Sequence, residues 1–231
     1  MQKRKTPRKS RKSAPAAQND TRGKTRERLI LIASREFAEK GWSNTVASVI
    51  CQKAEANVAA VNYYFGGKEG LYRAVWDYAV DTAINSTQPK DLSSNTDREW
   101  LYNYIRLCVM SVFDAGEAGL LPRLIANETN DPSPISDEVL SEHLAPRVKD
   151  LKTRLRSMLG PDVSDFQIGY CILSIHSQFS ALTVNRSARR NLFNNDNPTP
   201  AEAERFTREI CAFIIGGIRA IKATPERKQK Q

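Results

Sequence analysis

Residues 45–65 read TVASVICQKAEANVAAVNYYF, and this stretch decides the fold. Its apolar residues are spaced to form the inner wedge of two short helices joined by a tight turn; they are Val49, Ile50, Ala54 and Val61. Small and polar residues remain for the outer side of the second helix, as a helix that enters the major groove requires. The stretch therefore predicts a helix-turn-helix unit that binds DNA.

The flanking sequence extends this unit to about residues 26–76. A first helix is indicated by apolar residues at helical spacing, namely Leu29, Ile32, Ala33 and Phe37. Gly41 follows at the position where a left-handed C-terminal cap is expected. We expect Thr45 to cap a second helix of about residues 46–53. The inward-facing residues of that helix would be Val46, Val49, Ile50 and Ala54.

A third helix is expected at about residues 57–63, and Gly66-Gly67 then breaks the chain. Lys68 begins a long fourth helix whose inward residues would be Leu71, Val75, Tyr78 and Ala79. Residues 86–97, STQPKDLSSNTD, collect turn-forming residues and form either a linker or a loop between packed helices.

Helical periodicity also dominates the rest of the chain, so the predicted fold class is all-α. One apolar stripe runs through Leu101, Tyr104, Ile105, Cys108 and Val112. A short helix is expected at about 120–130, and a helical region over 136–159 that is interrupted or kinked near Pro146. Two further helices are expected at about 164–184 and 201–222.

The last two predicted helices are apolar on more than one face. In the first, one stripe comprises Phe166, Tyr170 and Leu173, and a second comprises Ile168, Ile172, Ile175, Phe179 and Leu182. In the other, Phe206, Ile210 and Phe213 share a face beside Cys211, Ile214, Ile215 and Ile218. A helix with two apolar faces needs two partners, either a homodimer partner or a wholly internal packing. We expect a homodimer through these helices.

The positive charge of the chain is concentrated at its start. The formal net charge is +9, and residues 1–28 hold eleven Lys and Arg against Asp20 and Glu27, so the remainder balances. Before Leu29 too little apolar sequence is present to form a core, and residues 1–23 are predicted to be a disordered basic arm. Three roles stay open for it: a solvating tail, a contact to DNA backbone or minor groove, and a receptor-read nuclear signal.

The composition favours a soluble cytoplasmic protein that is not an enzyme. No apolar run approaches the roughly 18 residues of a membrane span. Free, buried thiols in a reducing compartment are expected for the widely spaced Cys51, Cys108, Cys171 and Cys211. With only His143 and His176, neither a metal site nor a cofactor is predicted. Asp114, Glu117 and Glu128 form a loose acidic cluster without a nucleophile and base arranged for catalysis.

Candidate DNA contacts lie on and beside the third predicted helix. Asn can pair bidentately with adenine, and alanine methyls can touch the thymine methyl. Tyr63, Tyr64 and Lys68 can donate to phosphates, which sets register without reading sequence. The complete candidate set is Thr45, Asn57, Ala59, Ala60, Asn62, Tyr63, Tyr64 and Lys68.

The stretch from Phe37 to Leu71 resembles the N-terminal domain of TetR-type bacterial transcriptional regulators. The matching residues are Phe37, Gly41, Trp42, Thr45, Ile50, Ala54, Tyr64, Phe65, Lys68, Glu69 and Leu71. Residues 57–63, NVAAVNY, are particularly similar to the recognition helix of the CecR/YbiH-like branch. Two positions depart from the pattern: Cys51 replaces the usual Ala, and a thiol there could sense oxidants. Glu55 replaces the usual Gly of the turn.

The resemblance implies a homodimer that reads a palindromic double-stranded DNA operator and is released by a small-molecule effector, with repression as the family default. It divides the chain into the arm, a DNA-binding domain at 24–80, a ligand-binding and dimerisation domain at 81–222, and a flexible tail at 223–231. Candidate ligand-pocket residues are Trp100, Tyr104, Arg123, Asn127, Tyr170, Ser174, His176, Ser177 and Gln178. The alternative is a DNA-coating protein without sequence preference that relies on the basic arm.

Overall fold

The computed structural model describes residues 16–86, 96–184, 186–193 and 198–223, and all of its regular structure is helical. The helices are α1 (Ala16–Lys40), α2 (Ala47–Lys53), α3 (Ala60–Phe65), α4 (Lys68–Asn85), α6 (Asp97–Phe113), α7 (Leu120–Asn130), α8 (Ser136–Leu159), α9 (Asp165–Val184), α10 (Arg186–Phe193) and α11 (Pro200–Ala223). The predicted all-α class is therefore confirmed for the described residues. Residues 1–15 of the predicted arm, most of the predicted linker and the tail from 224 lie outside them.

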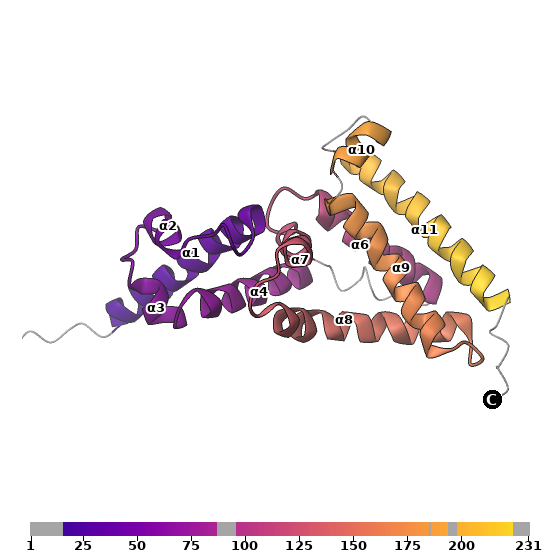
Figure 1. Cartoon of the computed structure of the whole chain (residues 1–231), viewed down its shortest axis with the longest axis horizontal. Helices are drawn as coiled ribbons and strands as arrows, with labels where there is room; N and C mark the ends of the chain where they lie inside the picture. Colours follow the sequence, from indigo (N-terminus) through magenta and orange to yellow (C-terminus); the bar gives the residue numbers. More distant parts are fainter. Residues whose placement is uncertain (1–15, 87–95, 185, 194–197, 224–231) are drawn as a thin grey trace, which may run out of the picture.

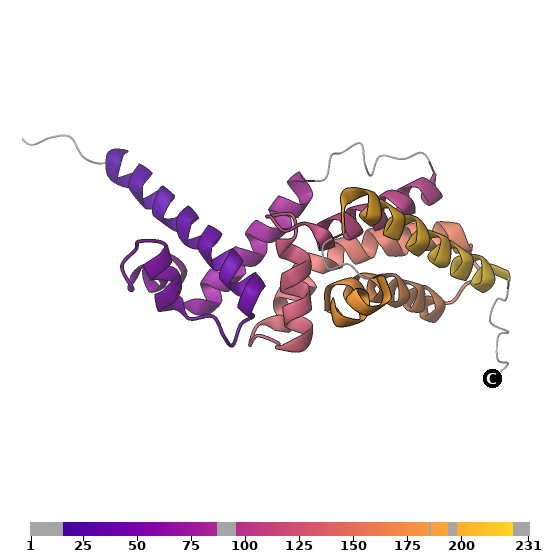
Figure 2. The ribbon, with the colours of Figure 1, turned by 90° about the horizontal axis from the view of Figure 1, so that it is seen from above.

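The molecule is elongated, with α1–α4 at one end and α6, α9 and α11 toward the other (Figure 1). We call α1–α4 the head and the remaining helices the body. Turned by 90°, the view shows α7 standing beside the head, while α6, α9 and α11 fill the far end (Figure 2). No described helix is long and apolar enough to cross a lipid bilayer.

Helix α1 begins at Ala16, which corrects the prediction of a disordered arm up to residue 23. The periodicity that indicated this helix started only near Arg26, because apolar residues mark the packed part of a helix and not its solvated extension. Once a helix is nucleated by packing, propagation over residues such as Ala16, Ala17 and Gln18 costs little free energy.

The head core combines residues from all four of its helices. Buried together are Leu29, Ala33, Phe37, Ile50, Cys51, Ala54, Val61, Leu71, Trp76 and Ala79. The same cluster continues into the body through Leu120, Leu121, Leu124 and Val139 of α7 and α8. The head is thus packed onto α7 by a shared apolar core, while the division at residue 80 stays a prediction.

A second core holds the body together. It is formed by α6, α8, α9 and α11 and includes Leu101, Ile105, Leu155, Ile168, Ile175 and Ile214. The predicted helix at 136–159 is confirmed, but Pro146 does not interrupt it. Val139 before the proline and Leu151 after it are both fully buried, so packing anchors both halves of α8 and offsets the lost hydrogen bond.

The predicted helices at 120–130, 164–184 and 201–222 are observed within one residue of those bounds. Helix α10 was not predicted, because its eight residues, RSARRNLF, are few and mostly polar. It packs on α11 through an edge-to-face contact of Phe193 with Phe206, whose ring centroids are 4.9 Å apart.

Candidate nucleic-acid interface

The turn between α2 and α3 is closed by an unusual backbone conformation at Glu55. Glu55 has φ +49°, in the left-handed region that favours glycine. The amide of Ala56 donates to the carbonyl of Cys51 at 2.9 Å, and the Arg28 guanidinium reaches the Glu55 carbonyl at 3.4 Å. Glu55 therefore keeps the turn geometry that glycine would adopt more cheaply, and Arg28 of α1 braces it.

The turn into α3 is organised by Asn57. Its side-chain Oδ1 accepts from the amide of Ala59 at 2.8 Å, and its carbonyl accepts from the amide of Ala60 at 2.8 Å. This Asn-centred turn delays the start of α3 to Ala60, three residues after the predicted start. Asn57 thus has a structural role in addition to its exposed position.

The outer side of α3 carries polar and small groups, while its inner side is anchored. Val61 is 2% exposed and packs in the head core, as predicted. Asn62 and Ala59 are exposed, and Tyr63 is 68% exposed with its ring set edge-to-face on Tyr64. This surface offers an amide, a methyl and a phenol to a partner that can approach the helix closely.

Two candidate DNA contacts of the sequence prediction have other roles in this structure. Thr45 is 2% exposed, and its hydroxyl donates to the carbonyl of Gly41 at 2.7 Å instead of capping α2. The capping residue is Val46, which is 55% exposed and has no side-chain cap bond, so its predicted inward position was wrong. The Thr45 hydroxyl turns to Gly41 because the left-handed Gly41 leaves carbonyls of the α1 terminus within reach.

Lys68 is the second of these residues. Its ammonium donates to the carbonyl of Trp42 at 2.6 Å and lies 4.3 Å from the centroid of the Trp42 ring. Burial lowers the pKa of Lys68, and the charge of Asp131 opposes that effect. In this structure the amino group fastens α4 to the α1–α2 turn. Tyr64 is half-buried, so of the three predicted phosphate donors Tyr63 is the most accessible.

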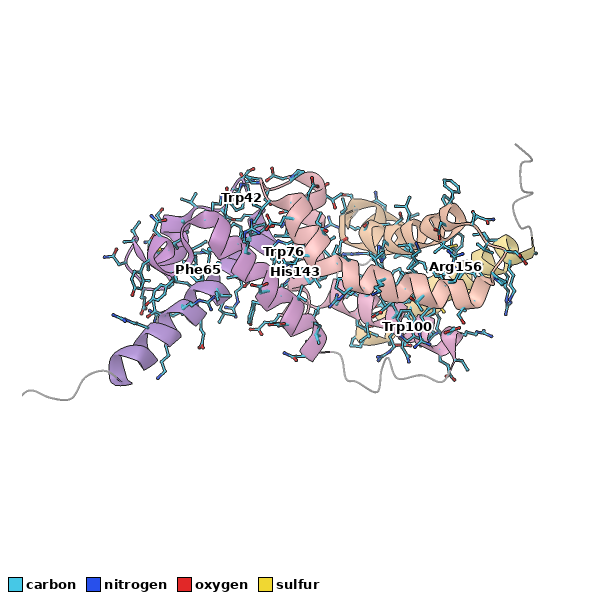
Figure 3. The ribbon with its side chains drawn as sticks, turned by 90° about the horizontal axis from the view of Figure 1, so that it is seen from below. Trp42, Phe65, Trp76, Trp100, His143 and Arg156 are labelled. Atoms are coloured by element: carbon cyan, nitrogen blue, oxygen red, sulfur yellow. The ribbon has the colours of Figure 1, made fainter. Side chains whose placement is uncertain are left out.

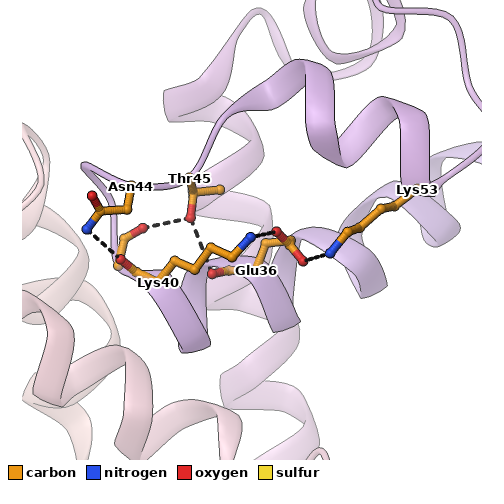
Figure 4. Close-up of polar contacts among 6 residues, drawn as sticks. Glu36, Lys40, Asn44, Thr45 and Lys53 are labelled. Atoms are coloured by element: carbon orange, nitrogen blue, oxygen red, sulfur yellow. Dashed lines mark hydrogen bonds and ion pairs between the residues drawn. The ribbon is translucent and has the colours of Figure 1, made fainter.

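A buried carboxylate joins α1 to α2 (Figure 4). Glu36 is 5% exposed and accepts from Lys40 at 2.8 Å and from Lys53 at 2.5 Å. Burial alone would raise the pKa of Glu36, but the hydrogen bonds and charges of the two lysines outweigh it and lower the pKa. The Lys53 contact links α2 to α1 and so supports the helix that carries α3, while Lys40 pairs with Glu36 within α1.

The corner between α3 and α4 is equally tight. A Cβ added at Gly70 would lie 1.9 Å from the backbone oxygen of Phe65, so no larger residue fits without moving α3. Gly70 therefore lets the first turn of α4 lie directly against the end of α3.

Helix α4 is fastened to the body along its length. The Tyr72 hydroxyl donates to the buried Glu128 of α7 at 2.5 Å, and Arg73 makes a bidentate ion pair with Glu138 of α8. The rings of Trp76 and His143 stack with centroids 5.8 Å apart, and both are labelled in Figure 3. A movement of α7 or α8 would thus displace α4.

The candidate ligand residues separate into different places. Trp100, Tyr104 and His176 come together in the body: Trp100 stacks on Tyr104 at 5.3 Å, and the Tyr104 hydroxyl lies 3.1 Å from His176 Nε2. Burial raises the pKa of Tyr104 and lowers that of His176. Burial also raises the pKa of the neighbouring Cys108 thiol to about 12. Tyr104, Cys108 and His176 are therefore neutral at neutral pH, although the Arg147 charge acts on Tyr104 and Cys108 and the Arg154 guanidinium lies 5.4 Å from the centroid of the Trp100 ring.

Arg123 and Asn127 lie elsewhere, on the side of α7 that faces the head. Arg123 donates to the carbonyls of Asp114 and Gly116 at 2.9 and 2.8 Å, and Asn127 donates to the carbonyl of Phe37. Tyr170 is 58% exposed on the outside of α9. Ser177 is exposed on the same helix, while Ser174 and Gln178 are half-buried, so these four do not join either group.

Sequence reasoning missed the placement of the basic residues nearest the interface. Arg22, Lys24, Arg26 and Arg28 lie on the helical α1, and all four are exposed. The Arg26 guanidinium lies 5.3 Å from the ring centroid of Phe65, at the end of α3, where α1 passes it in Figure 3. Continuing the helical register upstream of Leu29 could have identified these positions.

Comparison with known proteins relates both ends of the chain to transcriptional regulators. Residues 29–75 match the family model "Bacterial regulatory proteins, tetR family". Residues 98–218 match the model "HTH-type transcriptional dual regulator CecR, C-terminal domain". A CecR dual regulator from Shigella flexneri is 23% identical over 190 residues, which cover 78% of this chain and 83% of that protein.

Solved structures share the fold at low sequence identity. A TetR transcriptional regulator from Chloroflexus aurantiacus superposes with a TM-score of 0.63 at 17% identity, over 85% of this chain and 96% of that one. The ketosteroid transcriptional regulator KstR2 of Mycobacterium tuberculosis gives a TM-score of 0.57 at 14% identity, over 83% and 93%.

Proposed function

The chain belongs to the TetR family of bacterial transcriptional regulators, in its CecR-like branch, and we propose that it is a ligand-responsive repressor. In this proposal a homodimer binds a palindromic operator through α3, and a small-molecule effector releases it. The relatives that match this chain are named as transcriptional regulators, which agrees with a non-enzymatic role. We place the protein in the bacterial cytoplasm, on the nucleoid.

The exposed surface of α3 is the observation that carries this proposal. Asn62 has an amide that can pair with an adenine edge, and Ala59 is small enough to let the helix approach the bases. Tyr63 can donate to a phosphate beside them. Basic residues of α1, among them Arg22 and Arg26, supply attraction to the backbone that does not depend on base sequence.

Homodimerisation is supported by an apolar stripe on α9 and α11 that nothing in the described chain covers. Phe166, Tyr170 and Leu173 follow one another at helical spacing and are 75%, 58% and 64% exposed. Phe213 of α11 is 71% exposed, and a Cβ at Gly216 or Gly217 would meet no atom within 4 Å. Two copies could pack these faces against each other about a two-fold axis.

Release by an effector is supported by the way the head is held. Two half-sites lie a fixed distance apart on DNA, so a shift of the two heads disfavours simultaneous docking. The contacts of α4 with α7 and α8 connect head position to the arrangement of the body. The effector must bind the released state more tightly than the DNA-bound state, since otherwise no release occurs.

Footprinting of the purified protein on DNA flanking its own gene tests this function. The proposal predicts two protected half-sites related by symmetry, with binding that far exceeds that of random DNA at the same salt concentration. Equal affinity for the flanking DNA and random DNA would contradict this proposal. If that binding were also lost when residues 1–22 are deleted, the protein would be a coating protein.

A further inference from the structure

A cleft of about 840 Å³ lies between the head and the body. Its walls come from α1, the end of α6 with the loop that follows, α7, the end of α9, and α10. Trp100, Tyr104 and His176 do not line it, so the cleft is separate from that group in the body. Its volume falls within the range of small-molecule sites in proteins.

The charged groups of this cleft are predominantly guanidinium groups from three different helices. Arg35 comes from α1, Arg123 from α7, and Arg189 and Arg190 from α10. The acidic residues in the walls are Glu39 and Asp114. Because guanidinium groups match the two oxygens of a carboxylate in geometry and charge, four of them against two acids favour an anion.

Two of the guanidinium groups are held in place by the protein. Arg189 is 7% exposed, donates to the carbonyl of Leu182 and lies 5.2 Å from the centroid of the Phe113 ring. Arg123 is oriented by the carbonyls of Asp114 and Gly116. A site whose cationic groups are already oriented loses less conformational entropy on binding.

The walls also provide apolar surface beside these charges. Val112, Phe113, Leu182 and Val184 line the cleft, and Val184 is 47% exposed. The combination suits a molecule with one anionic end and one apolar body. We propose that the cleft binds a small organic carboxylate that carries a hydrocarbon or aromatic group.

The position of the cleft gives such a ligand control of the head. Asn127 lines the cleft and at the same time donates to the carbonyls of Phe37 and Ala38 at the end of α1. A bound carboxylate would touch Arg35 of the head and α10 of the body together. This regulatory consequence rests on the proposed function, whereas binding itself does not.

Calorimetric titration of the full chain without DNA tests the site. The probes are benzoate, octanoate and 4-phenylbutyrate, and the matched neutral probe is 4-phenylbutyramide. We expect saturable binding of at least one acid, with the amide of 4-phenylbutyrate at least ~10-fold weaker than its acid. Arg35→Gln and Arg190→Gln should each weaken binding several-fold. Arg205→Gln, an exposed position on α11, serves as the control and should leave it unchanged.

Three results would overturn the site: no saturable binding of any of the acids at millimolar concentration, equal binding of acid and amide, or unaltered binding by both variants. A second, separate experiment measures the affinity of the protein for operator DNA with and without the acid. Bound acid without any change in operator affinity would reject the regulatory consequence. Failure to find sequence-specific DNA binding would reject the proposed function while the calorimetric result stands.

Discussion

The side-chain amide of Asn127 donates to the carbonyl oxygen of Phe37 at 2.8 Å and to that of Ala38 at 3.1 Å. These carbonyls belong to the last turn of α1, where few backbone donors remain; the Phe37 carbonyl also accepts from the Gly41 amide at 2.9 Å. Asp131, just after α7, accepts from the amide and hydroxyl of Ser43 at 3.1 and 2.8 Å. The end of α7 therefore caps the end of α1, which ties the head to the body independently of α4.

Asn127→Ala should lower the free energy of unfolding by about 1–3 kcal/mol, because the Ala38 carbonyl loses its side-chain donor and the Phe37 carbonyl keeps only the Gly41 amide. Asn130→Ala is the matched control, since the Asn130 side chain donates to the carbonyl of Ala126 within its own helix. Urea unfolding of both variants measures the difference. Equal losses would show that the Asn127 contact does not join the two helices energetically.

Glu55→Gly should leave stability unchanged or raise it by up to about 1 kcal/mol. A left-handed conformation costs an L-residue roughly 1–2 kcal/mol, and the larger chain entropy of unfolded glycine offsets part of that gain. Glu55→Val should instead destabilise, because a β-branched residue tolerates positive φ poorly. Urea unfolding measures the stability of both variants. A valine variant as stable as the glycine variant would show that the left-handed conformation at position 55 causes no strain.

Glu55 also shows how far sequence reasoning reached. The spacing of Ile50, Ala54 and Val61 identified the turn, and the resemblance to TetR-type regulators indicated that Glu55 stands where glycine is usual. Neither revealed that Arg28 would meet the Glu55 carbonyl, 27 positions away. Contacts between distant residues depend on how helices cross, and periodicity within one helix contains no information about that.

The same limit explains why two candidate DNA contacts also have contacts within the protein that the sequence did not indicate. Thr45 and Lys68 belong to the expected motif, but their polar atoms meet carbonyls of the α1–α2 turn, a tertiary contact. The exposed positions on α3 were predicted more accurately, since the inward Val61 fixes which side of a short helix faces out. The cleft between head and body combines residues from five segments, so among its wall residues only Arg123 and Asn127 were named as ligand candidates from the sequence.

Glu36→Gln should lower the free energy of unfolding at neutral pH. It should also make that free energy depend less on pH in the acidic range. The lysine contacts lower the pKa of Glu36 below the ordinary value of 4.5, so its contribution is present above that pH. That contribution is lost as pH falls through the folded pKa, because the unfolded state binds the proton first. Urea unfolding at pH about 7 and about 3 should show a smaller difference in unfolding free energy between the two pH values for the variant than for the unaltered chain.

The control for this measurement is Glu39→Gln, an exposed position on the same helix. If Glu36→Gln and Glu39→Gln gave the same dependence of unfolding free energy on pH, the buried carboxylate would have no special role.

Leu173→Glu should convert the protein to monomers at concentrations where the unaltered chain is dimeric. A carboxylate in the middle of the apolar stripe would lose its hydration on dimerisation without a partner. Leu192→Glu on α10 is the control, because Leu192 is 75% exposed and lies outside the stripe. Light scattering after size-exclusion chromatography measures the masses. A dimer that survives Leu173→Glu would rule out this face as the interface.

The central claim is that the exposed face of α3 reads base sequence, and Asn62→Ala tests it most directly. The variant's affinity for the footprinted operator and for random DNA is measured at one salt concentration, with Asn44→Ala as a control on the α1–α2 turn. We predict a loss of about 1–3 kcal/mol on the operator, with affinity for random DNA almost unchanged. Equal losses on both DNAs would contradict base reading by Asn62.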